Sequence, residues 1–160
     1  MTLTSFPASA LAVAIRSERA TVQALLETLT EERQLLGAGD TDRLTDTAAR
    51  KRELLLQLAQ FGDQRNRLLR RAGFRPDRDG MRAFLDHPAA TSELGTEWQA
   101  LIETTRKARR LNDENGIFID AGMRANQQAL SVLISAASGN TYGPGGRSVS
   151  PLSSRTLASA

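Results

Sequence analysis

A helical repeat runs without interruption through the C-terminal half of the chain and limits what the chain can fold into. Alternating steps of four and three residues from Leu94 lead to Ala136 and meet only apolar, small, hydroxyl or amide side chains. This spacing keeps side chains on one face of an α-helix. The sequence therefore predicts one very long helix over about 92–137, roughly 70 Å at about 1.5 Å per residue.

The middle of this repeat is polar, because Asn112, Asn115, Gly122 and Asn126 lie on it. Buried asparagines can hydrogen-bond inside a bundle and set its register at some cost in stability. Alternatively, these residues line a groove that receives the helix of another protein. The dipeptide Asn115-Gly116 is also a hairpin signal. Since the repeat keeps its phase on both sides of this pair, we expect the helix to continue, with a local bend.

Two further amphipathic helices are predicted upstream, over about 9–36 and about 41–72. The segment from Gly37 to Asp40 separates them with two glycines and an aspartate, the residues that stop one helix and cap the next at an antiparallel reversal. Gly73 closes the second helix. The expected core face of that helix contains Leu44, Ala48, Leu54, Leu55, Leu58, Phe61, Leu68, Leu69 and Ala72.

The connector over 74–91 contains Pro76, Gly80 and Pro88, and a short helix is expected within it at about 79–86. Only 4% of the residues are aromatic, and no strand-like alternation occurs. The predicted fold class is therefore all-α: an antiparallel three-helix bundle or coiled coil with a very long third helix and a short helical connector. We expect one helical domain over 1–137.

The segment over 138–160 is rich in glycine, serine and proline, so it buries too little apolar area to offset the entropy of ordering. We expect this tail to be disordered. The chain shows no signal-peptide pattern and no apolar run long enough to insert into a membrane. The predicted localisation is the cytoplasm.

The residues predict no enzyme, no cofactor and no metal site. The chain has no cysteine, and its one histidine, His87, lies in a loop beside a proline. No nucleophile has an adjacent base. The second helix carries a basic face, which we interpret as solvated and not as a nucleic-acid site, since stacking aromatics are missing and the net charge is only +3. Its members are Arg50, Lys51, Arg52, Arg65, Arg67, Arg70 and Arg71.

A family resemblance rests on several of these residues. Asn112, Asn115-Gly116, Ile119, Asn126, Leu130 and Leu133, followed by Tyr142-Gly143 and Gly145-Gly146, resemble the C-terminal half of the FlgN-type flagellar export chaperones. Upstream, Glu31-Glu32, the turn at Asp40, the run from Lys51 to Leu55 and Trp98-x-x-Leu101 are similar as well. The resemblance covers roughly Leu11 to Gly146.

The resemblance implies a cytoplasmic chaperone of flagellar type III secretion. Such a protein binds the C-terminal helical regions of the hook-filament junction proteins, prevents their premature assembly and delivers them to the export apparatus. Its partners would be these clients, the flagellar export gate and, as a further candidate, the export ATPase. The client-binding residues would be Ala129, Leu130, Leu133 and Ile134, and Tyr142 with Gly143 would dock on the export gate.

Two other functions use the same features. The long seam could let the chain self-associate as a structural coiled-coil scaffold. The basic face of the second helix could instead serve a nucleic-acid-associated protein.

Overall fold

The computed structural model describes residues 8–139, with side chains as far as Ala137, and contains four helices there. They are α1 (Ala8–Ala38), α2 (Thr41–Arg71), α3 (Arg78–Leu85) and α4 (Ser92–Gly139). The predicted class, three long helices with a short connector helix, is confirmed. The chain divides into two compact units, Met1–Ile119 and Asp120–Ala160. The domain extent of 1–137 stays a prediction, and residues 140–160, with Tyr142 and Gly143, lie outside the described residues.

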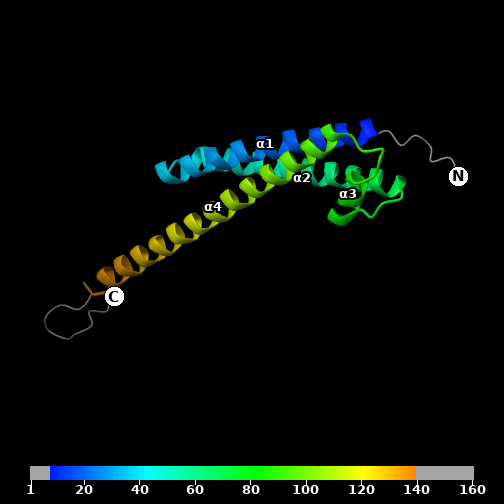
Figure 1. The fold of residues 1–160 in the computed structure, drawn as a ribbon. Coiled ribbons are helices and arrows are strands. Elements are labelled where there is room, and N and C mark those ends of the chain that lie inside the picture. The colour runs from blue at the N-terminus through cyan, green and yellow to red at the C-terminus, as the bar shows by residue number, and fades with distance from the viewer. Residues whose placement is uncertain (1–7, 140–160) are drawn as a thin grey trace, which may run out of the picture. The chain divides into compact units, whose positions relative to one another are not determined.

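Within the first unit the long helices run up, down and up. Helices α1 and α2 lie side by side in opposite directions (Figure 1). The start of α4 runs parallel to α1, since the residue numbers of their ion-paired partners increase together along the two helices. These pairs are Arg16–Glu93 at 2.9 Å, Arg19–Glu97 at 2.9 Å and Arg33–Glu114 at 4.0 Å.

Local capping explains where the helices begin and end. Gly39 and Gly73 have φ angles of 68° and 83°, the left-handed conformation that ends a helix at low cost in glycine. Asp40 caps α2, as predicted, by accepting a hydrogen bond from Arg43 N at 3.2 Å. Asp77 caps α3 by accepting a hydrogen bond from Gly80 N at 2.8 Å. At the start of α4, Thr91 Oγ1 accepts a hydrogen bond from Leu94 N at 3.2 Å.

The apolar core joins α1, α3 and the first half of α4, with a smaller share from α2. Met81 and Phe84 of α3 are fully buried, so the short helix contributes to the core through these two side chains. Burying an aliphatic or aromatic side chain of this size contributes about 1.5–3 kcal/mol. The large buried apolar residues of the other helices are Leu11, Ile15, Val22, Leu25, Leu29, Leu35, Leu69, Leu94, Trp98 and Leu101.

The predicted core face of α2 is too broad. Leu69 is its only fully buried leucine in the described structure, whereas Ala48 and Leu55 are exposed. Leu54 and Leu55 are neighbours, about 100° apart around the helix, so one narrow stripe cannot bury both. Leu54 is half-buried on that stripe. Helix α4 continues through Asn115-Gly116 without a break, as the phase of the repeat indicated.

Gly80 is required by packing, because a Cβ atom there would collide with the backbone of Arg75. We expect Gly80→Ala to lower the free energy of unfolding by about 1–3 kcal/mol, the usual cost of overpacking. Gly116→Ala is the matched control, since a Cβ atom there meets open space within a helix. It should raise stability by up to about 1 kcal/mol. Urea denaturation measures both, and equal effects would contradict the packing argument.

Candidate functional site

Asn115 belongs to a polar network that joins all three long helices, in which its amide contacts α1 and Glu32 of α1 contacts α2. Its side chain is buried, with 1% of the residue exposed. Asn115 Nδ2 donates to Leu29 O at 2.9 Å and to Glu32 Oε2 at 2.8 Å. The other oxygen of the same carboxylate, Glu32 Oε1, accepts from Lys51 Nζ of α2 at 2.7 Å. These contacts hold one residue from each helix at the same height in the bundle.

The other polar residues of the predicted seam are not brought into this network. Asn112, Gly122 and Asn126 are exposed, and a Cβ atom at Gly122 would meet open space. Asn115 alone of these four residues hydrogen-bonds between helices in the described structure. The register-setting role of the set stays a prediction, and the contacts favour it at Asn115 only.

A second polar contact joins the same three helices near the other end of the bundle. Arg65 Nη1 lies 2.5 Å from both carboxylate oxygens of Glu18, and its guanidinium lies 5.3 Å from the ring centre of Trp98. Burial raises the pKa of Glu18 above its ordinary value of 4.5, although the charge and hydrogen bond of Arg65 oppose this shift. Glu18 and Glu32 are thus both buried on α1, and each is paired with a cation of α2.

This arrangement corrects the prediction for the basic face of α2. Lys51 and Arg65 do not belong to a solvated face, because each turns toward a buried carboxylate of α1. The other five members of that face, Arg50, Arg52, Arg67, Arg70 and Arg71, are exposed. The visible signal was the placement of two glutamates on the apolar seam of α1, since a buried carboxylate needs a cationic partner.

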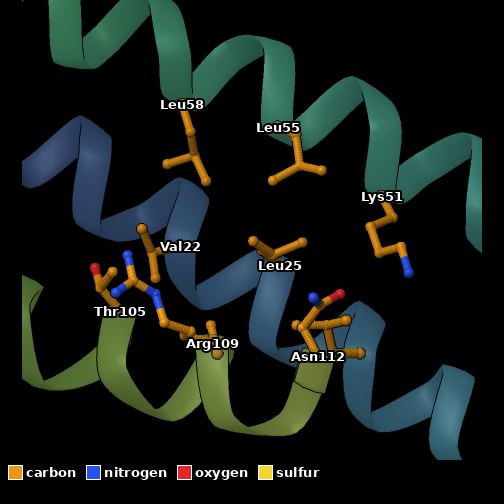
Figure 2. Close-up of a pocket in the computed structure, with 10 residues that line it drawn as sticks. Val22, Leu25, Lys51, Leu55, Leu58, Thr105, Arg109 and Asn112 are labelled. Atoms are coloured by element: carbon orange, nitrogen blue, oxygen red, sulfur yellow. The ribbon is translucent and has the colours of Figure 1, made fainter. Parts of the chain in front are cut away.

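An apolar cavity of about 260 Å³ lies between the two polar contacts. Figure 2 shows Leu55 and Leu58 of α2 facing Val22 and Leu25 of α1, with Arg109 and Asn112 of α4 nearby. The small side chains Thr105 and Ala108 of α4 leave this space open. The lining of the cavity is mostly apolar and holds no nucleophile with a base. The sequence signal for this cavity was the pair of small residues, Thr105 and Ala108, that follows Leu94, Trp98 and Leu101 on the α4 seam.

The predicted client-binding residues lie together on the second unit, near the end of α4. Ala129, Leu130, Leu133 and Ile134 are all exposed. Met123, Leu130 and Leu133 are spaced by seven and three residues, so they share one helix face; we call these three residues the α4 strip. They are 57%, 58% and 65% exposed. The opposite face carries Arg124 and Gln128 together with Val132, which is 67% exposed.

Among the described residues, no three His, Cys, Asp or Glu side chains are grouped to hold a metal ion. No helix there is both long and apolar enough to cross a membrane.

His87 has a local structural role: its Nδ1 accepts from Ala89 N at 3.2 Å, and its ring packs edge-on against Phe74.

Removal of the Asn115 amide tests the first polar contact. Asn115→Ala leaves a carboxylate oxygen of Glu32 buried without this donor, so we expect the free energy of unfolding to fall by about 1–3 kcal/mol. Asn126→Ala is the matched control on the same helix. Because Asn126 is exposed and alanine is the better helix former, this change should be neutral or stabilising by about 0.5 kcal/mol. Equal destabilisation by both variants, measured in urea, would contradict the assignment.

The raised pKa of Glu18 predicts a pH effect on stability. Between pH 4.5 and the raised pKa, the folded state binds more protons than the unfolded state, so this contribution to stability is lost as pH rises. Glu18→Gln removes it. We expect the unfolding free energy of the parent, relative to Glu18→Gln, to increase as pH falls from neutral toward 4.5. If the two curves are parallel, or if the stability of the parent decreases relative to Glu18→Gln, burial does not raise the pKa of Glu18.

Comparison with known proteins identifies the family. Residues 7–150 match the family described as FlgN protein. A stretch of 59 residues is 36% identical to the flagella synthesis protein FlgN of Salmonella typhimurium and, equally, to that of Salmonella typhi. This stretch covers 37% of the chain and 42% of each relative, so less than half of either relative's length is matched. No solved structure matches the chain.

The FlgN family consists of non-enzymatic flagellar chaperones, in agreement with the expectation that this chain is not an enzyme. The helical bundle described above is consistent with that assignment. Because the family match extends over most of the 160 residues, the chain belongs to the FlgN family.

Proposed function

We propose that the chain is a cytoplasmic export chaperone that binds the C-terminal helical regions of the flagellar hook-filament junction proteins. It keeps these clients from assembling prematurely and delivers them to the flagellar type III export apparatus. Family membership supports a role in building the flagellum. The proposed client-binding site lies on the part of α4 that belongs to the second unit, at Ala129, Leu130, Leu133 and Ile134.

The exposure of the α4 strip is the observation that carries this proposal. Three large apolar side chains on one helix face are more than half exposed. Covering apolar surface contributes about 25 cal/mol per Å², so a partner that buries this face gains affinity from it. Anchors spaced by three and seven residues suit the apolar face of an amphipathic helix. The C-terminal helix of a client fits this description.

Delivery to the export gate rests on the resemblance alone. In the sequence Tyr142 is the third residue after the end of α4, and we propose that Tyr142 and Gly143 dock on the gate while the α4 strip holds the client. This arrangement gives the two partners separate binding residues along a short stretch of chain. The client can then remain bound until the chaperone has reached the export apparatus.

Leu133→Asp tests the client site, because a carboxylate on the covered face must lose its hydration without gaining a partner. We expect the dissociation constant for a junction protein's C-terminal fragment, measured by isothermal titration calorimetry, to rise at least about tenfold, or 1.4 kcal/mol. Helicity should be unchanged. Val132→Asp is the matched control: Val132 is 67% exposed, but lies about 100° around the helix from Leu133.

Two outcomes would contradict the proposal. Equal weakening by Leu133→Asp and Val132→Asp would show that the effect does not depend on the α4 strip. A parent protein that forms a stable homo-oligomer through this strip, and binds no junction-protein fragment, would instead support a self-associating scaffold. Analytical ultracentrifugation of the parent and of Leu133→Asp distinguishes these cases.

A further inference from the structure

We propose that a groove between α3 and α4, in the first unit, is a second docking surface that binds an acidic amphipathic segment of a partner protein. Four arginines line this groove: Arg78 and Arg82 of α3, and Arg106 and Arg109 of α4. We call it the arginine groove. It lies among residues 78–109, does not include the α4 strip, and is independent of the proposed client site.

The arginine groove consists of two adjoining hollows of about 220 and 460 Å³. They share Arg78 and Ile102, so one surface depression continues into the other. Ile102 and Leu85 are partly buried and form an apolar floor together with Trp98. The arginines, by contrast, are all exposed. An apolar floor between cationic walls fits a ligand that is apolar on one face and negatively charged on the other.

The positive charge of the groove is only partly balanced within the described part of the chain, because Glu103 interacts with the charge of Arg106 but forms its ion pair with Lys107. In the first unit some basic side chains, such as Arg16, Lys51 and Arg65, have carboxylate partners, whereas exposed arginines of α2 such as Arg52 and Arg67 form no ion pair among the described residues. None of the four groove arginines takes part in an ion pair there. Asp79 is the one carboxylate among the described lining residues. A partner that supplies carboxylates would relieve the repulsion between like charges and form charge-assisted hydrogen bonds.

The observations favour an acidic protein segment over nucleic acid or a membrane. Single-stranded nucleic acid needs exposed aromatic rings for stacking, but Trp98 is only 8% exposed and Arg65 lies over its ring. A membrane surface would be met by a flat or protruding face, whereas these residues line hollows. The chain's own segments outside the described residues, 1–7 and 140–160, contain no aspartate or glutamate that could fill the groove.

Trp98 provides a built-in reporter, because it is the only tryptophan and lines the groove. The probe is a synthetic helical peptide with glutamates on one face and leucines on the other, titrated into the full chain. We expect saturable changes in Trp98 emission that weaken as salt is added. Arg78→Glu/Arg106→Glu should weaken this binding at least tenfold. The same variant should gain affinity for a peptide in which lysines replace the glutamates.

Arg52→Glu/Arg67→Glu is the matched control, since it changes the net charge equally at two exposed arginines of α2 that do not line the groove. The affinity of this control for the acidic peptide should stay within about twofold of the parent's affinity, once the general loss of charge attraction is corrected by salt titration. If charge reversal unfolds the chain, Arg78→Gln/Arg106→Gln removes the charges without reversing them. That variant should still bind the acidic peptide at least tenfold more weakly.

Several results would overturn the proposal. One such result is that the groove variant and the control variant lose peptide binding equally. Another is that neither variant loses it. Tighter groove-dependent binding of a single-stranded RNA oligomer or of phosphatidylglycerol vesicles than of the peptide would assign the groove to those ligands. Groove-dependent dimerisation would assign it to a second copy. Leu133→Asp should leave peptide binding intact, so failure of the client proposal and failure of this one are distinguishable.

Discussion

Two carboxylates, Glu18 and Glu32, are buried on α1, and each needs a cationic or hydrogen-bonding partner from another long helix. A buried charge without a partner costs several kcal/mol, and removing one member of a buried pair typically costs about 3–5 kcal/mol. Helix α2 supplies a cation to each, Arg65 and Lys51, and α4 supplies the Trp98 ring at one site and the Asn115 amide at the other. Apolar packing can tolerate a shifted helix, but these directional contacts cannot, so they favour one alignment of the three helices.

The two units of the chain present different chemistry. In the first unit the seam of α4 is buried at Leu101, Ala108 and Asn115, whereas in the second unit the α4 strip is exposed. The first unit adds a surface of another kind, the arginine groove, where charge is left unpaired. An apolar strip and a cationic groove select different partners. A chaperone that must hold a client and also meet other proteins benefits from such separate surfaces.

Much of the fold could be predicted from local patterns. The spacing of apolar residues identified the long helices, and the glycines before Asp40 and at position 73 marked their ends, because left-handed backbone and capping depend on adjacent residues. The same reasoning failed for Leu55 and for Lys51 and Arg65. Whether a residue beside an apolar stripe is covered depends on the width of the neighbouring helix, and whether a cation turns inward depends on carboxylates far away in sequence. The proposed client-binding residues follow from the family resemblance, and their exposure agrees with contact to a partner.

By itself, the sequence determined the all-α class, the helix order and the unbroken repeat of α4, because helical periodicity and capping are properties of consecutive residues. Tertiary structure decided which asparagine of the seam is buried. Asn112 and Asn115 lie on the same repeat, yet only Asn115 reaches both Leu29 O and Glu32 Oε2 of α1. It also decided where charge stays unpaired, since Arg78 and Arg106 meet only when α3 folds back beside α4. Both outcomes depend on distances between helices, which the pattern along one helix does not contain.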